Sequence, residues 1–344
     1  MSLYLQVLTE EMAKRGVLFG GDKPLRWLEP GIGDGSSTAK FIKAMSMFHS
    51  AGFIIHGSDY QLNSIERARI NLTALQGTNI RIGELSVRDA FSGEPLASEK
   101  CDCAMLSHFI YHLKSQLDGR RFTALEMDLA LRRLIGAVMD SLNGGGVAFA
   151  FHEGAASDMF GKLGVEYGSA MNDAPDRIRK AADAIGKPTI SMMLESNLYF
   201  PDLTQEVLFN LKSIDNWRGH SEGTPEASWI KKFLFALHNT RNESQSGEPV
   251  KEGGVRDLDK LPSTRGNPSR MGDAIDRLVE LFTRDEYGPH IVIRSEMQVI
   301  LNDQAYADVV GAAFVEVEKR LPDIRRAARS AMLAARLCKT HLSG

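Results

Sequence analysis

The residues with the clearest chemical meaning form a glycine-rich loop that follows a short apolar run. The segment LRWLEPGIGDGSSTAKFI has an apolar stretch ending at Glu29, then Gly31, Gly33 and Gly35, then a helical pattern. Glycines let the chain turn tightly and let a ligand approach the backbone without a Cβ in the way. We therefore expect a strand, a ligand-binding loop and the start of a helix. An ordinary glycine-rich βα turn is the alternative.

Two classes of cofactor bind loops of this kind, and the spacing of the glycines separates them. Dinucleotide sites use Gly-x-Gly-x-x-Gly, with the pyrophosphate at the N-terminus of the helix. Here Gly35 comes one residue early, and Ser36 occupies the position of the third glycine. A glutamate at the strand end, Glu29, also suits a ligand with an amino group better than one with a pyrophosphate. The spacing favours a methyl donor.

The loop resembles motif I of the class I S-adenosylmethionine-dependent methyltransferases, Glu/Asp-x-Gly-x-Gly-x-Gly. In this chain the motif appears as Glu29-Pro30-Gly31-Ile32-Gly33-Asp34-Gly35. The resemblance implies S-adenosyl-L-methionine as cofactor, with the glycines passing under its amino acid and ribose parts. It also implies an α/β, Rossmann-like class I methyltransferase fold with a mostly parallel seven-stranded sheet and helical insertions that cover the substrate.

Other positions of the cofactor site follow from the same resemblance. Asp59 ends the second apolar run, 24 residues after Gly35, where the family has an acid that binds the ribose hydroxyls. A carboxylate can accept hydrogen bonds from two neighbouring hydroxyls, although a strand-end Asp is often only a turn residue or a helix cap. Asp89 matches the position that meets the adenine amino group. The expected cofactor-binding residues are Glu29, Gly31, Gly33, Gly35, Ser36, Ser37, Asp59, Tyr60, Asp89, Ala90, Phe91, Leu106 and Ser107.

The candidate catalytic residues follow the fourth apolar run, in the segment SHFIYHL. Ligands of open α/β sheets bind outside the carboxyl ends of the strands. If this segment is helical, His108, Tyr111 and His112 share one face. They could orient an amine or accept a proton from a hydroxyl. The alternative is that one histidine caps a helix and Tyr111 packs in the core. No metal is expected.

Residues 101–168 further resemble histamine N-methyltransferase and its relatives. The resemblance lies in CDCAMLSHFIYHLKS and FHEGAASDMFGKLGVEYG. It implies a small-molecule acceptor covered by an insertion between the last strands. This chain differs in its EPGIGDG motif, in having Asp59 where a glutamate would be expected, in the histidines after the fourth run and in a helical tail. The acceptor therefore stays open.

The elements that must position these residues are strands alternating with helices. Such alternation predicts βαβ units and a parallel sheet with both faces covered. The strands are expected at 25–29, 53–58, 79–84, 101–107 and 146–152. Later in the chain we expect a helix near 173–186, a strand at 204–214, a helix at 228–240, a polar loop at 241–272 and a strand or hairpin at 290–302.

The domain organisation follows from where this alternation holds. We expect a methyltransferase domain over 1–303 and a C-terminal helical extension over 304–344. In the extension, Pro322 is expected at the first turn of a second helix rather than inside one. The apolar residues of the tail are expected to pack on their own domain rather than on a second subunit. Within the domain we expect a core at about 17–152, 186–215 and 288–303, and cap segments at 1–16, 153–185 and 216–287.

Composition limits the class of function. The 344 residues carry a formal net charge of −3, which gives little support to nucleic-acid binding. The N-terminal stretch is charged and no long apolar run occurs, so we expect a soluble protein that binds no membrane. The three cysteines lack metal-site spacing, which favours a cytoplasmic protein. We expect an enzyme that methylates a nitrogen or oxygen of a small molecule, as a monomer or homodimer. The alternatives are a cofactor-binding regulatory or structural protein without catalysis, and a methyltransferase acting on a protein.

Overall fold

A central sheet organises the part of the protein that the computed structural model describes, which is residues 2–75, 79–107, 123–153, 173–199, 279–285 and 288–342. The strands are β1 (Leu25–Pro30), β2 (Phe53–Asp59), β3 (Ile80–Val87), β4 (Cys101–Ser107), β5 (Leu142–Glu153), β6 (Thr189–Tyr199), β7 (Thr283–Asp285) and β8 (Gly288–Leu301). The helices are α1 (Ser2–Lys14), α2 (Ser36–Met45), α3 (Leu62–Thr73), α4 (Ala124–Asp140), α6 (Ala174–Asp183), the 3-10 helix η4 (Gln304–Tyr306) and α11 (Ala307–Leu342).

The order and direction of the strands define the fold. The order is β3-β2-β1-β4-β5-β8-β6, and the short β7 pairs with β8 outside this path. Strands β1 to β5 pair in parallel, whereas β8 runs antiparallel to both β5 and β6. The expected Rossmann-like fold with a mostly parallel sheet is confirmed; seven strands form the main path of the described sheet, and the short β7 makes an eighth strand that was not expected.

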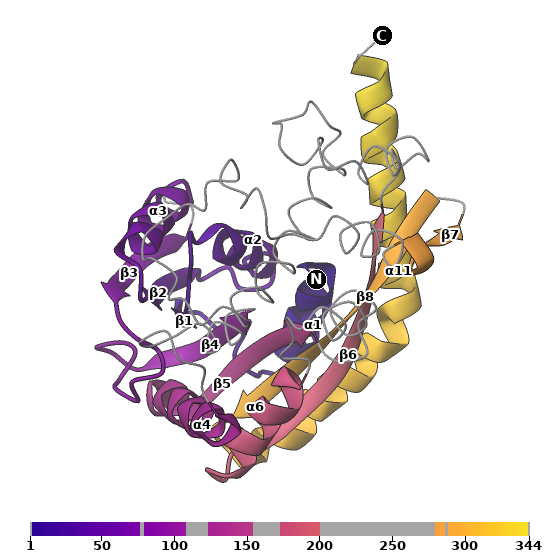
Figure 1. Ribbon diagram of the computed structural model, residues 1–344. Coiled ribbons are helices and arrows are strands. Elements are labelled where there is room, and N and C mark those ends of the chain that lie inside the picture. The colour runs from indigo at the N-terminus through magenta and orange to yellow at the C-terminus, as the bar shows by residue number, and fades with distance from the viewer. Residues whose placement is uncertain are drawn as a thin grey trace, which may run out of the picture.

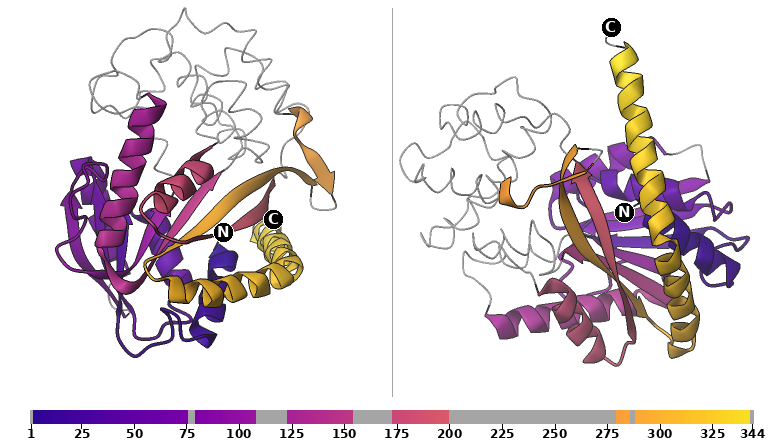
Figure 2. Two further views of the ribbon diagram at one scale, coloured as in Figure 1. Left: turned by 90° about the horizontal axis from the view of Figure 1, so that it is seen from below. Right: turned by 90° about the vertical axis from the view of Figure 1, so that its right-hand side faces the viewer.

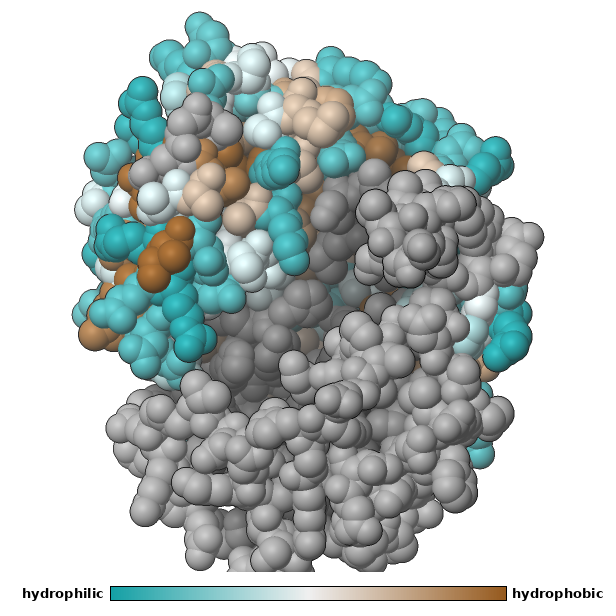
Figure 3. All heavy atoms as spheres, turned by 90° about the horizontal axis from the view of Figure 1, so that it is seen from above, coloured by the Kyte–Doolittle hydropathy of each residue, from teal (hydrophilic) through white to brown (hydrophobic). Residues whose placement is uncertain are grey.

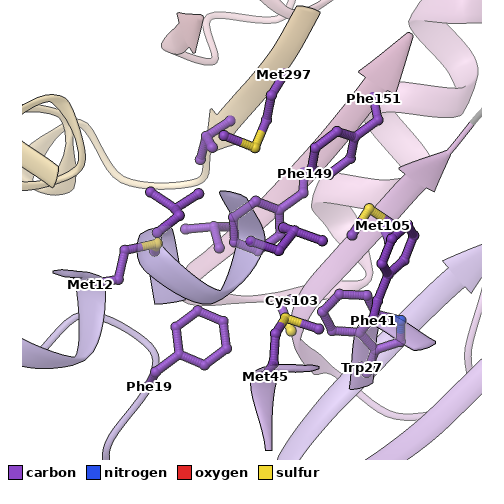
Figure 4. Close-up of a cluster of buried hydrophobic side chains, with 14 of the residues drawn as sticks. Met12, Phe19, Trp27, Phe41, Met45, Cys103, Met105, Phe149, Phe151 and Met297 are labelled. Carbon is purple, nitrogen blue, oxygen red and sulfur yellow. The ribbon is translucent and has the colours of Figure 1, made fainter. Parts of the chain in front are cut away.

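Two apolar cores cover the two faces of the sheet. Side chains alternate along a strand, so Trp27 of β1 lies in one core and Leu28 in the other. The first core is formed with α1, α2, α3 and α11, and the second with α4 and α6. Figures 1 and 2 show α4 and α6 on one side of the sheet and α1 and α11 on the other. Figure 4 shows part of the first core, where aromatic rings and methionines from several strands and helices meet.

Most of the expected elements are present, with one further omission. The five early strands and the late strand at 290–302 are confirmed, and the helix near 173–186 is α6. Strand β6 was not expected at 189–199, yet it pairs with β8 over its whole length. The elements expected at 204–214, 228–240 and 241–272 lie outside the described residues.

The C-terminal helix corrects the expectation for Pro322. Helix α11 is continuous from Ala307 to Leu342, with Pro322 inside it. Pro322 is exposed, so the carbonyl of Glu318 that loses its helical partner can face water. Phe314 and Ile324, on either side of Pro322, are both buried in the first core. Tertiary packing therefore outweighs the local preference, and the helix is bent along its length (Figures 1 and 2).

The tail packs on its own domain, as expected. Helix α11 contacts α1 and β6, and its residues Val310 and Val317 are fully buried. Charged groups join the two helices, because Arg320 donates to both Glu10 and Glu11 at 3.1 and 3.2 Å. No described helix has the length and apolar character needed to cross a membrane. The division into caps, core and extension stays a prediction.

Candidate cofactor site

The glycine loop leaves β1 and enters α2 through three left-handed residues. Gly31, Gly33 and Gly35 have φ values of 69°, 57° and 71°, which residues with a Cβ rarely adopt. A Cβ on Gly33 would meet no described atom within 4 Å, so the space beside it is open. A Cβ on Gly35 would lie 3.1 Å from the Cα of Ala68 in α3. Gly33 therefore leaves room for a ligand, whereas Gly35 lets two helices pack closely.

Two hydrogen bonds attach the loop to the end of β2, and a third closes the turn that follows Asp59. Ile32 donates its backbone amide to the carbonyl of Ser58 at 3.0 Å. Gly33 donates its amide to Oδ2 of Asp59 at 3.1 Å, and Gln61 donates to Oδ1 at 2.9 Å. The Asp59 side chain is buried, and a carboxylate has about four acceptor positions, of which these bonds use two. Asp59 can thus hold the loop and still accept hydrogen bonds from a ligand.

The loop after β3 lies beside Asp59 and completes this edge. Arg88 donates its amide to the carbonyl of Asp59 at 3.0 Å. Asp89 accepts from the amide of Phe91 at 2.9 Å through Oδ1, while Ala90 is buried. Tyr60 is half exposed next to Asp59. The structure therefore brings the predicted ribose and adenine positions together.

Exposed apolar surface occurs near this edge. Tyr60 is half exposed, and Leu62 and Val87 are both more than half exposed. Val87 pairs with Asp59 in the sheet. Figure 3 views the molecule from above Figure 1, and on the described part of that face apolar residues lie scattered among hydrophilic ones. An apolar ring of a ligand would find contacts beside the Asp59 carboxylate.

The sheet opens beside the loop, between β1 and β4. Pairing of these strands ends at Leu28 and Ala104. Beyond that point β1 pairs only with β2, and the end of β4 pairs only with β5, up to Ser107 and Phe151. Strand order reverses here, and the carboxyl side of such a switch point is where open α/β sheets bind ligands. Leu106 is fully buried in the second core, and Ser107 is partly exposed at the strand end.

Helix α2 begins at the loop without a side-chain cap. Its N-cap residue is Gly35, which offers no side chain to bond the first turn. The amide of Ser36 is bound by Oδ1 of Asp34 at 2.9 Å, and this bond lowers the pKa of the Asp34 carboxyl. Ser36 and Ser37 thus stand in the first turn of α2, where the positive end of the helix dipole faces the loop.

Glu29 is the most unusual charged group of the site. Its side chain is 3% exposed, and Oε2 accepts a hydrogen bond from the indole nitrogen of Trp27 at 3.2 Å. Burial raises the pKa of Glu29 to about 7, against the lowering effects of Thr38 and Trp27. Among the described residues, no cation contributes to this shift. A buried carboxyl without a cation fits a ligand that carries a positive charge.

Some of these features were expected from the sequence and others were not. Trp27 and Thr38 were not recognised as neighbours of Glu29. The available signal was the spacing of Trp27 and Glu29, since residues i and i+2 of a strand share one face. The predicted catalytic residues His108, Tyr111 and His112 lie outside the described residues, so their role stays a prediction.

Comparisons with known proteins give a likeness of fold only. No family model matches the chain, and no curated protein matches it. Among solved structures, the YcgJ protein from Bacillus subtilis is 13% identical, with 88% of this chain and 98% of that chain covered and a TM-score of 0.41.

Two further solved structures are methyltransferases by name. The magnesium protoporphyrin IX methyltransferase from Synechocystis PCC 6803 is 14% identical, with 58% and 78% covered and a TM-score of 0.38. The plantazolicin methyltransferase is 13% identical, with 88% and 85% covered and a TM-score of 0.37. Likeness of this degree carries no assignment of function, and it leaves the predicted relation to histamine N-methyltransferases untested.

Proposed function

We propose that the protein is an S-adenosyl-L-methionine-dependent methyltransferase that acts on a nitrogen or oxygen of a small molecule. The observation that carries this proposal is the contact between Gly33 and Asp59. It places an open glycine loop and a buried carboxylate with spare acceptor capacity at one edge of the sheet, beside the switch point between β1 and β4.

The residues present fit this cofactor at its polar groups. Asp59 would accept hydrogen bonds from the ribose hydroxyls, and Glu29 would pair with the ammonium of the amino acid part. Tyr60, Asp89, Ala90 and Phe91 would surround the adenine. The remaining length of the cofactor would be lined by the loop glycines and by Ser36, Ser37, Leu106 and Ser107.

The protein's own contribution to the reaction is orientation and exclusion of water. The bound cofactor supplies a methyl group that its sulfonium already activates, so binding the acceptor in line is the main requirement. His108 or His112 would orient an amine or take a proton from a hydroxyl. The cap segments 1–16, 153–185 and 216–287 would exclude water from this space.

Two measurements test the proposal. Isothermal titration with S-adenosylmethionine and with S-adenosylhomocysteine should show binding near one equivalent. A tritiated-methyl screen against amines, phenols and carboxylates, and then against proteins, should identify the acceptor. Absence of binding by the folded protein would refute the proposal. Binding without transfer to any acceptor would favour a regulatory or structural role.

A further inference from the structure

Trp27 lies two positions before Glu29 in β1, and its one polar atom, the indole nitrogen, points to the Glu29 carboxyl. The side chain is fully buried in the first core, where Figure 4 shows it among Phe41, Met45 and Cys103. An indole N–H is a donor only and needs an acceptor when it is buried. Its acceptor is Oε2 of Glu29, at 3.2 Å. Trp27 thus fixes one carboxyl oxygen of Glu29 from the side of the first core.

Thr38 approaches the same carboxyl from α2. It lies in the first helical turn and is fully buried. Among the described residues its Oγ1 has no hydrogen-bond partner of good geometry. The hydroxyl is nevertheless close enough to lower the pKa of Glu29. A change of the Thr38 χ1 angle would be needed to bring this hydroxyl to the carboxylate as a second neutral donor.

The two neighbours are donors without charge, and this decides what the carboxyl can do. A buried carboxylate that is held by neutral donors keeps its negative charge uncompensated, which is costly in an apolar environment. A cation that binds beside it removes this cost, so ionisation of the carboxyl and binding of a cation favour each other. The group is therefore suited to sense a cationic ligand rather than to stabilise the fold.

We propose that Trp27 is a positioning residue that holds the Glu29 carboxylate with a neutral donor, assisted by the uncharged Thr38, so that its charge, unpaired with any cation of the described residues, is available to the primary ammonium of the ligand. This rests on the proposed function, because that ammonium belongs to the amino acid part of the methyl donor. Trp27 and Thr38 act through Glu29 and do not themselves touch the ligand.

The first test is the pH dependence of S-adenosylhomocysteine binding, measured by calorimetry between pH 6 and 9. In Trp27→Phe, loss of the donor should raise the pKa of Glu29 and move the midpoint of binding upward by about one pH unit. Affinity relative to wild type should then fall about fivefold at pH 7 and recover to within about twofold at pH 9. Thr38→Val should shift the midpoint in the same direction, and Thr38→Ser should restore it.

A double-mutant cycle separates positioning from a merely structural role. In the Glu29→Gln background, Trp27→Phe should change affinity by less than about twofold, because the carboxyl that it positions is gone. Phe53→Leu, a truncation elsewhere in the same core, is the matched control and should leave the midpoint unchanged. A Trp27→Phe effect of equal size in both backgrounds, or an unmoved midpoint, would overturn the proposal.

A readout without ligand distinguishes the two hypotheses from each other. The pH dependence of unfolding, taken as wild type minus Glu29→Gln, reports the ionisation of Glu29 directly. Trp27→Phe should move this ionisation upward as well. If wild type binds neither S-adenosylmethionine nor S-adenosylhomocysteine, the proposed function fails together with the role toward the ammonium. If wild type binds, and Trp27→Phe moves neither the pH midpoint of ligand binding nor the pH at which Glu29 ionises in the unfolding measurement, only the positioning role fails.

Discussion

The backbone amide of Gly33 donates to Oδ2 of Asp59 at 3.1 Å, across 26 residues of sequence. The two positions that carry the resemblance to motif I and to the ribose acid are thus parts of one unit. The contact ties the conformation of the loop to the carboxylate at the end of β2. A change at either residue is expected to affect the other.

Loss of the Asp59 carboxylate should weaken donor binding. Asp59→Ala removes both the acceptor for Gly33 and the acceptors available to ribose, and we expect at least a tenfold loss of affinity. Gly33→Val, whose side chain would stand in the open space beside the loop, should have an effect of similar size. Calorimetry with S-adenosylmethionine measures both, with circular dichroism to verify the fold. Unchanged affinity in both variants would refute the assignment of the site.

Two neighbouring glycines should differ in their effect on stability. Gly33→Ala carries only the strain of a positive φ, about 1–2 kcal/mol. Gly35→Ala adds a close contact with the Ala68 backbone, for which overpacking typically costs a further 1–3 kcal/mol or so. Urea denaturation of the two variants makes the comparison. Equal losses would mean that α2 and α3 are not packed as closely as Gly35 requires.

Glu29 should make the protein less stable as the pH rises. The pKa of Glu29 is raised to about 7 from its ordinary value of 4.5. Between these values the folded protein holds a proton that the unfolded chain has released, so the free energy of unfolding falls with rising pH. The full effect is about 3 kcal/mol and is complete above pH 7 or so.

A neutral variant isolates this effect. Glu29→Gln removes the titrating group, so its free energy of unfolding relative to wild type should rise as the pH goes from 5 to 8. Urea denaturation at each pH provides the measurement. Glu66→Gln, on the exposed side of α3, serves as control and should show no such trend of comparable size. A flat difference for Glu29→Gln would show that the carboxyl is not protonated in the folded protein.

The histidines after β4 should affect turnover rather than donor binding. His108→Ala or His112→Ala should lower kcat by about 10²–10⁴ if the residue serves in acid–base catalysis. Affinity for S-adenosylhomocysteine should stay nearly unchanged. Tyr111→Phe, which removes only a hydroxyl between them, tests whether the aromatic ring or its polar group matters. A double histidine variant with wild-type turnover on the true acceptor would show both to be structural.

The early strands could be predicted because local pattern and burial agree there. The apolar runs that contain Trp27 and Cys103 are short, rich in β-formers and bounded by turn residues, and both proved to be central strands. Strand β6 was missed for a physical reason. Its buried residues Met192 and Leu194 alternate with exposed ones. The exposed residue between them, Met193, is apolar, so the sequence does not alternate between apolar and polar residues there.

The chemical setting of Glu29 could be predicted only in part. Its place at the strand end, before the glycines, follows from the motif. The burial of its carboxyl without a cation from the described residues, and the approach of Thr38, depend on how α2 packs over β1, which a single sequence does not specify. Pro322 illustrates the same limit, because packing of Phe314 and Ile324 keeps the helix continuous across it.

The place of β8 in the sheet has a consequence for synthesis on the ribosome. β8 lies between β5 and β6, and the nearest end of β6, Tyr199, precedes Gly288 by 89 residues. Until the chain has been translated past Leu301, both β5 and β6 present an unpaired edge to other nascent chains. Unpaired edges promote association between molecules. Termination anywhere before β8 should therefore yield aggregates rather than a smaller folded protein, and chaperone demand should peak just before this strand emerges.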